Sequence, residues 1–217
     1  MLLALPESEL RARVPATPEW SVRDVLAHVV GLACDLNAER FPAADDIGGV
    51  EWGRLQVERA RDLTLRDLIA EWDREAPKFE DGLRTFGYEV GSHFLADLYV
   101  HFQDVRSAVG ASPSADEPAV AVALDHYLGY LSELLAGEGW GTLEVVVGEE
   151  TRVLGCEGRH RARLTTEPSE LLRVVSGRRS AAQIRALDWD GDLDRVLELL
   201  QTVLTGAYSL PQVDLVE

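Results

Sequence analysis

The 217-residue chain is poor in cysteine, with only Cys34 and Cys156, which stand far apart and form no CxxC pair. Neither a disulfide framework nor a cysteine-based zinc site is therefore expected. Basic residues are also scarce, because 21 Lys and Arg stand against 38 Asp and Glu, for a formal net charge of −17. Nucleic acids and anionic membrane surfaces bind basic footprints, so this charge argues against both as partners.

Long apolar runs are missing as well, since none approaches the roughly 20 residues of a membrane span. The N-terminus lacks the basic start, apolar stretch and cleavage site of a signal peptide, so we expect a cytoplasmic protein. No GxSxG, GxxxxGK or dinucleotide-binding glycine pattern occurs. What is present is ordinary for a globular protein: 46% hydrophobic and 27% charged residues, in a length that suits one large domain or two small ones.

Helical patterns fill the first half of the chain. Helices are expected to begin at Ser21 and Thr64, because each is followed three residues later by an aspartate that completes a capping box. Pro77 should kink or split the second of these helices. Residues 15–19, with two prolines, predict a rigid connector, and residues 41–52 predict a loop.

The second half changes character after a boundary near residues 111–114. Helical patterns there alternate with short β-branched runs, which predict strands at residues 142–147, 152–154, 161–165 and 184–189. We therefore expect an α+β protein with two domains, a helical bundle over residues 1–112 and a small α/β domain over residues 113–217.

Residues 94–106 predict an amphipathic helix that carries an acid and an imidazole among its apolar positions. The apolar stripe consists of Leu98, Phe102, Val105 and Val109. Asp97 and His101 are four residues apart, so both side chains lie on one helix face. In that relation they can bind one divalent ion together, or they can form a charge-assisted pair without a metal.

His28 is the candidate third ligand, because it lies on the inward face of the helix that begins at Ser21. The alternative is a buried histidine whose ring nitrogens are satisfied by hydrogen bonds. His93 is a rival or fourth ligand, and Asp104 could orient His101 from outside the metal. Two imidazoles and a carboxylate in a helical bundle leave open positions, as catalytic zinc sites do.

Arg178 and Arg179 form a basic cluster with the serines on either side, within an acidic protein. These two arginines could bind the carboxylate of a substrate. They could equally offset the dipole at the C-terminus of a helix.

Two segments, TPEWSVRDVLAH at residues 17–28 and DLYVHFQDVR at residues 97–106, resemble the mycothiol-dependent maleylpyruvate isomerase family, within the DinB-like metal-binding bundles. Residues 176–180 and 188–192 resemble the C-terminal sterol-carrier-like α/β domain of that family. The resemblance implies a DinB-like four-helix bundle followed by a sterol-carrier-like domain. It also implies a truncated first helix, because only residues 1–13 precede the connector.

The resemblance further implies that His28, Asp97 and His101 bind a divalent metal, commonly zinc, although the family usually has glutamate at the acidic position. It implies mycothiol or a similar low-molecular-weight thiol as cofactor. In the isomerase, the thiolate would add to an activated double bond, permit rotation and leave, while Arg178 or Arg179 holds the substrate carboxylates.

The expected function is a metal-dependent, mycothiol-using isomerase or transferase that acts on a small organic acid or electrophile. The alternative is a non-catalytic metal- or small-ligand-binding protein of the DinB-like superfamily, in which the bundle mediates homodimer formation.

Overall fold

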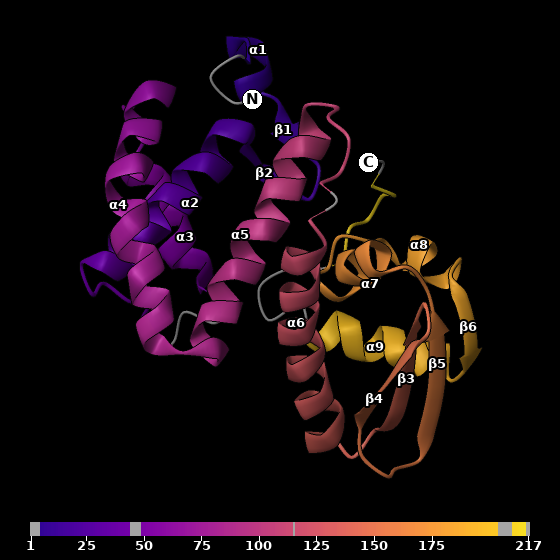
Figure 1. The fold of residues 1–217 in the computed structure, drawn as a ribbon. Helices are drawn as coiled ribbons and strands as arrows, with labels where there is room; N and C mark the ends of the chain where they lie inside the picture. The colour runs from indigo at the N-terminus through magenta and orange to yellow at the C-terminus, as the bar shows by residue number, and fades with distance from the viewer. Residues whose placement is uncertain (1–4, 44–48, 115, 204–209, 216–217) are drawn as a thin grey trace. The chain divides into compact units, whose positions relative to one another are not determined.

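The structure is a computed structural model that describes residues 5–43, 49–114, 116–203 and 210–215 (Figure 1). The chain divides into two compact units after Ser114. The described part of unit 1 is mainly helical, whereas unit 2 combines helices with a four-stranded sheet. The predicted α+β class is confirmed, and the domain limits 1–112 and 113–217 remain a prediction. Every described helix is too short or too polar to cross a membrane.

Unit 1 begins with a short hairpin. Its elements are α1 (Glu7–Leu10), β1 (Arg13–Val14) and β2 (Thr17–Ser21). The two strands pair antiparallel, so the connector predicted at residues 15–19 is wrong in its second half, which belongs to β2. Val14 is fully buried and joins the hairpin to a cluster that includes Val25 and Val105.

Longer helices make up the rest of unit 1. They are α2 (Val22–Asn37), α3 (Val50–Arg59), α4 (Leu65–Phe86) and α5 (Tyr88–Ala108). Both predicted capping boxes are confirmed, because Ser21 and Thr64 each exchange hydrogen bonds with the aspartate three residues later. Pro77 lies inside α4 and does not split it, so that alternative is wrong.

The sequence patterns do not predict α3. They predict a loop at residues 41–52 and place the start of the next helix at Thr64. In the structure Gly49, at φ +67°, precedes α3, which occupies residues that read as loop and linker. Only Gly53 and Gln56 of α3 are buried, and the partly buried Trp52 packs against the core cluster of Leu32, Ala33, Leu36 and Phe79.

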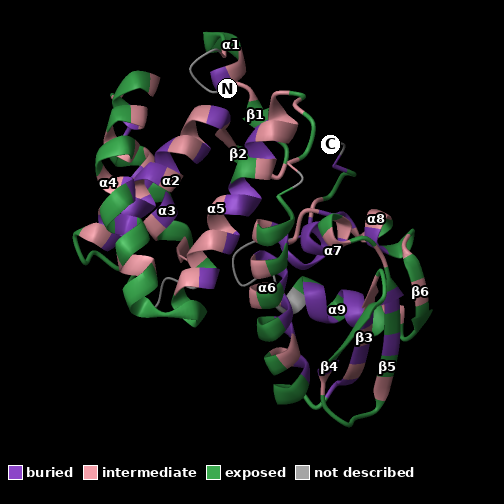
Figure 2. Cartoon of the chain, viewed as in Figure 1, coloured by how far each residue is buried: buried purple, intermediate pink, exposed green. Residues whose placement is uncertain are grey.

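The helix α5 carries a mixed interior face (Figure 2). Val105 is buried as predicted, but Phe102 is 40% exposed and does not belong to the buried stripe. His101 and Asp104 are buried instead. The buried face of α5 therefore includes polar residues that the predicted apolar stripe does not contain.

Unit 2 packs helices with a sheet of strand order β4-β3-β5-β6. Its elements are α6 (Glu117–Gly137), β3 (Gly141–Val147), β4 (Glu150–Gly155), β5 (His160–Thr165), α7 (Pro168–Val175), α8 (Ala181–Arg185), β6 (Asp188–Gly191) and α9 (Leu193–Val203). The central strands β3 and β5 are parallel, and the other pairs are antiparallel. The strand predicted at 184–189 is wrong at its start, because Ile184 belongs to α8 and the strand begins at Asp188.

Candidate metal centre

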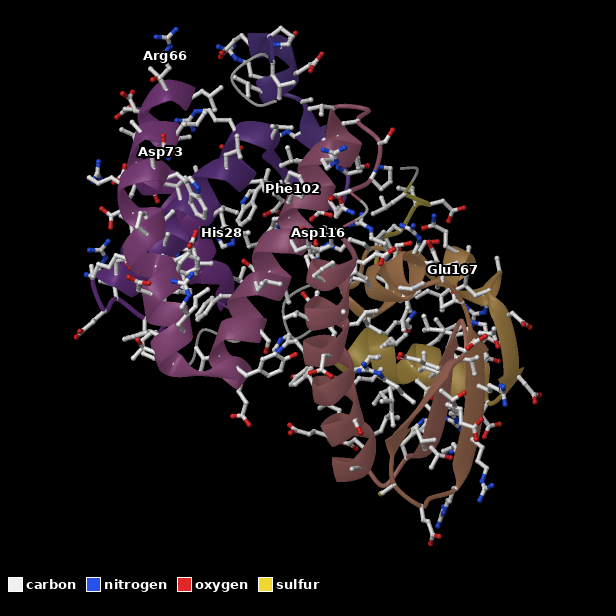
Figure 3. All side chains as sticks on the ribbon, in the orientation of Figure 1. His28, Arg66, Asp73, Phe102, Asp116 and Glu167 are labelled. Atoms are coloured by element: carbon white, nitrogen blue, oxygen red, sulfur yellow. The ribbon has the colours of Figure 1, made fainter. Side chains whose placement is uncertain are left out.

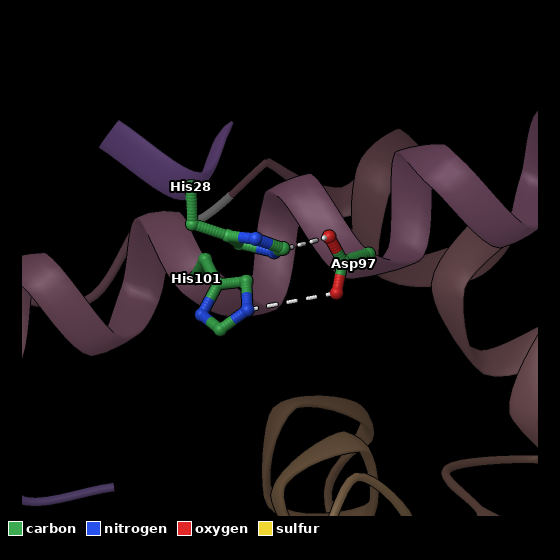
Figure 4. Close-up of side chains that lie close together, drawn as sticks. All are labelled: His28, Asp97 and His101. Carbon is green, nitrogen blue, oxygen red and sulfur yellow. Dashed lines mark ion pairs between the residues drawn. The ribbon is translucent and has the colours of Figure 1, made fainter. Parts of the chain in front are cut away.

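His28, Asp97 and His101 come together in unit 1 (Figure 4). Each offers one ligand atom, and these atoms all lie within 4.8 Å of one another. The helix α2 supplies His28, and α5 supplies the other two from positions one turn apart. Asp97 and His101 lie on one face of α5, as their spacing predicts, and the fold adds His28 from a segment about 70 residues earlier in the chain.

Asp97 lies between the two imidazoles. Its Oδ2 is 3.5 Å from Nε2 of His28, and its Oδ1 is 3.5 Å from Nε2 of His101. The two histidines are 8% and 6% exposed, whereas the Asp97 side chain is 33% exposed. The imidazoles therefore point Nε2 toward a carboxylate that lies at the edge of the buried region.

The pKa of Asp97 reflects these neighbours. Burial alone raises the pKa of this carboxyl. The neighbouring imidazoles, His101 first and then His28 and His93, favour the ionised carboxylate and together outweigh burial, so the pKa lies well below the ordinary value of 3.8. Asp97 is consequently ionised across the physiological pH range and available as a ligand.

The opposite nitrogen of His28 contacts a residue that the sequence patterns do not single out. Nδ1 of His28 lies 2.7 Å from Oε1 of Gln56, and Nε2 of Gln56 donates to Oδ2 of Asp35 at 3.0 Å. Gln56 is 1% exposed and Asp35 is fully buried. The sequence signal for this pair is an aspartate near the end of a helix whose other buried positions, apart from His28, are apolar.

His101 is supported differently. Its Nδ1 lies 3.4 Å from Oδ2 of Asp104, which is the residue predicted to orient it. This buried nitrogen has no hydrogen bond within the described part of the chain. The predicted neighbour is therefore present at ion-pair distance.

Trp20 closes one side of the centre. Its ring centroid is 5.0 Å from that of His28 and 6.1 Å from that of His101, and the two imidazoles meet edge to face at 5.1 Å. The ring belongs to β2, so the short hairpin supplies a hydrophobic wall. His93, the predicted rival ligand, is not part of the three-residue group and packs its ring against Phe94.

A cavity of about 240 Å³ lies among α2, α4 and α5 and reaches His101. Its walls are aliphatic or aromatic apart from that histidine, and they include Val29, Trp72 and Phe102. Figure 3 labels His28 and Phe102 on the ribbon of unit 1. The candidate centre thus borders an apolar cavity, and none of the residues that line this cavity is an aspartate, glutamate, lysine or arginine.

The arginines predicted to hold a carboxylate lie in unit 2, after α7. The guanidinium of Arg179 binds both oxygens of Glu170, at 2.6 and 2.7 Å, and its side chain is 10% exposed. Arg178 donates to the carbonyl of Ser176 at 2.6 Å. Both arginines thus have partners within their own unit, and their role toward a substrate stays a prediction.

Residues 1–106 match the family described as the mycothiol maleylpyruvate isomerase N-terminal domain. Unit 1 belongs to this family. Two crystal structures of the mycothiol-dependent maleylpyruvate isomerase, one of them a histidine-to-alanine mutant, are similar to the chain at 15% and 14% sequence identity. Each covers 82% of this chain and 82% of its own, with TM-scores of 0.49 and 0.48 respectively. No curated protein matches the chain in sequence.

The donor set of this maleylpyruvate isomerase-type domain fits a divalent ion. Ligand atoms about 2.0–2.1 Å from a tetrahedral zinc lie about 3.3–3.4 Å apart. Each imidazole lies 3.5 Å from one oxygen of Asp97, and one atom from each residue lies within 4.8 Å of the others, so small side-chain shifts would bring all three to one ion. The aspartate is one methylene shorter than glutamate, yet its two oxygens reach both imidazoles. Nitrogen and carboxylate donors in this number suit zinc and leave room for a further ligand.

Proposed function

We propose that the protein is a metal-dependent, thiol-using isomerase or transferase of the mycothiol-dependent maleylpyruvate isomerase type. The observation that carries this proposal is the convergence of His28, Asp97 and His101 at spacings suited to one ion. Membership of unit 1 in the N-terminal domain family supports mycothiol or a similar thiol as the cofactor.

The three residues would have distinct tasks. His28 and His101 would each offer Nε2, and Asp97 would offer a carboxylate oxygen and offset part of the charge of the ion. A bound divalent ion would lower the pKa of a coordinating thiol, so that the thiolate is present near neutral pH. Trp20 covers the imidazole rings on one side and limits access of water to the centre.

The apolar cavity supports a small electrophile as substrate, in preference to a small organic acid bound wholly within unit 1. Burial of a carboxylate without a cation is costly, and the cavity lining contains no lysine or arginine. A volume of about 240 Å³ suits a short alkyl or single aromatic group next to His101. A carboxylate on the same substrate would require a cation from elsewhere, for which Arg178 and Arg179 remain the prediction.

The competing function is a non-catalytic protein that binds a metal or a small apolar ligand. The same metal centre and cavity support this alternative function, because a protein can bind a metal or a ligand there without catalysing a reaction. The two functions differ in whether a thiol is consumed or an electrophile rearranged in the presence of the protein.

Metal analysis of the purified protein tests the first step. We expect about one zinc per chain by mass spectrometry, with loss of the ion in H28A and H101A and retention in H126A, which alters a histidine of unit 2. A wild-type protein that takes up no divalent ion after incubation with excess zinc would contradict the metal-dependent proposal.

An activity screen then separates enzyme from binding protein. The zinc-loaded protein would be assayed with small α,β-unsaturated electrophiles, neutral and carboxylated, with mycothiol, with another thiol, and with neither. Thiol-dependent consumption or cis–trans conversion that H101A lacks supports the enzyme. Saturable binding of an electrophile without any conversion supports the alternative.

A further inference from the structure

Asp35 is a fully buried carboxylate of α2 whose side-chain partners come from α3 and from the turn after α2. Arg40 donates to Oδ1 at 2.8 Å, Arg59 of α3 pairs with Oδ2, and Gln56 of α3 also donates to Oδ2. Burial raises the pKa of Asp35, and the three hydrogen bonds with the charge of Arg59 outweigh burial and lower it overall. Asp35 is therefore a fixed anion that can only accept hydrogen bonds.

This anion decides which way the Gln56 amide faces. Since a carboxylate cannot donate, the NH₂ group of Gln56 must point toward Asp35, and the amide oxygen must point toward His28. The reverse orientation would set the amide oxygen against the carboxylate. With Gln56 only 1% exposed, water does not offer an alternative partner.

An amide oxygen only accepts, so the His28 nitrogen 2.7 Å away must carry the proton. We infer that Gln56, held by Asp35, fixes His28 as the tautomer protonated at Nδ1 and so reserves Nε2 for a ligand. Gln56 and Asp35 are thus positioning residues, since neither belongs to the three-residue group. Asp97 also faces the ring, but its Oδ2 lies 3.5 Å from Nε2, so the shorter 2.7 Å contact with Gln56 decides the tautomer. The consequence for the metal rests on the proposed function.

The backbone is arranged to permit this contact. A Cβ at Gly31 of α2 would lie 2.7 Å from Cβ of Gln56, and a Cβ at Gly53 of α3 would lie 3.3 Å from Nδ1 of His28. Glycine at both positions lets α3 approach α2 closely enough for the Gln56 amide to reach the imidazole ring. At this contact α3 therefore places Gly53 and Gln56 against α2, at positions where helices usually pack larger apolar side chains.

The tautomer can be measured directly in the metal-free protein. Two-bond ¹H–¹⁵N correlation spectra at about pH 9, where free imidazoles are neutral, distinguish the two tautomers, and H28A identifies the His28 signals. We expect His28 protonated at Nδ1 in the wild type and a shift toward protonation at Nε2 in Q56L, where the carboxylate of Asp97 is the remaining acceptor at the ring. A wild-type His28 protonated at Nε2 would overturn the inference, whether or not the protein binds zinc.

Zinc affinity, measured by competition with a chromophoric chelator, tests the consequence. We expect Q56L to bind zinc about 10- to 100-fold more weakly, as is usual when an outer partner of a ligating histidine is lost. Q103L is the matched control, because Gln103 is also a part-buried, hydrogen-bonded amide of unit 1. Equal affinity of Q56L and the wild type, within twofold, would overturn the positioning role.

A paired substitution separates positioning from a merely structural effect. In D35N/Q56E the glutamate at position 56 still accepts from His28, the asparagine at position 35 donates to it, and the net charge is unchanged. We expect this variant to recover most of the affinity that Q56L loses and to keep the Nδ1 tautomer. If wild-type protein binds zinc but D35N/Q56E behaves as Q56L does, the contact chain does not act as inferred. If the wild type binds no zinc, the proposed function fails and the spectrum alone decides the tautomer.

Discussion

Both units bury polar side chains, but they place them differently: those of unit 2, Arg173, Ser176, Arg179 and Ser180, lie in and just after α7, away from the strands. The interior of unit 1 holds two imidazoles, an amide and two carboxylates, from residues His28, Asp35, Gln56, His101 and Asp104. The buried positions of the central strands β3 and β5 in unit 2 hold apolar side chains such as Leu143, Val145 and Leu164. Buried polar groups contribute little net stability and are costly when any partner is lost. The buried polar groups of unit 1 are therefore a candidate functional site, and the metal-dependent proposal depends on them.

Loss of a ligand should have the largest effect of any change in unit 1. We expect D97N to weaken zinc binding by more than about 100-fold, beyond the loss typical of outer partners, because one carboxylate serves both sides of the centre. Calorimetric titration or chelator competition measures this. D192N is the control from unit 2, because Asp192 also contacts an imidazole, His160, at 3.0 Å. If D97N and D192N lost zinc affinity to a similar extent, the zinc site could not be assigned to unit 1.

A core substitution in unit 2 should show the opposite behaviour. Leu164 is 1% exposed in the central strand β5. We expect L164A to lower the free energy of unfolding by about 2–5 kcal/mol, through lost burial and the cavity left behind. Urea denaturation followed by circular dichroism measures the loss. Zinc stoichiometry and affinity at 20 °C should stay at the wild-type value, and a parallel loss of zinc would show that the units are not independent.

Removal of the buried anion of unit 1 should have a smaller, pH-dependent effect. Because the pKa of Asp35 is lowered in the folded protein, its carboxylate stabilises the fold above the unfolded pKa of about 3.9. That contribution is lost as the pH falls through the folded pKa. We expect D35N to be less stable by about 1–3 kcal/mol at pH 7, with a difference that shrinks below about pH 4. Urea denaturation from pH 3 to 7 tests this, and a difference independent of pH would contradict it.

The smallest expected effect is a difference in reactivity between the two cysteines, Cys34 of unit 1 and Cys156 of unit 2. Burial, followed by the charge and hydrogen bond of Glu71 and the charge of Glu75, raises the pKa of Cys34 to about 12. Cys156 of unit 2 is exposed. With iodoacetamide at pH 8, we expect Cys34 to react at least about 100-fold more slowly than Cys156, since the thiolate is the reactive form. Peptide mass spectrometry measures both rates, and equal labelling would show that Cys34 is accessible and ionisable.

Local signals in the sequence were sufficient for several parts of the fold. The capping pairs at Ser21 and Thr64 predicted the starts of α2 and α4 correctly, because both partners lie within one turn of the same chain segment. The four-residue spacing of Asp97 and His101 likewise determines that they share a helix face. Such features depend on neighbours in the sequence, which a single chain displays directly.

The parts that were missed depend on contacts between segments. The helix α3 escaped detection because its buried positions are Gly53 and Gln56, so it lacks the apolar periodicity that identifies a helix. The contact of Gln56 with His28 and Asp35 exists only once α2 and α3 pack together. The pairing of Arg179 with Glu170 across the turn after α7 was equally invisible to local patterns.

The unusual packing face of α3 also has a consequence for motion. The buried residues of α3 are a glycine and a glutamine, so beside the partly buried Trp52 its hold on α2 includes the hydrogen bond of Gln56 and the ion pair of Arg59 with Asp35. Segments of this kind open at lower free energy than the core around them. We therefore expect the amide hydrogens of α3 to exchange with solvent before those of α2. A ligand on His28 would slow that exchange, which makes α3 a reporter of whether the centre is filled.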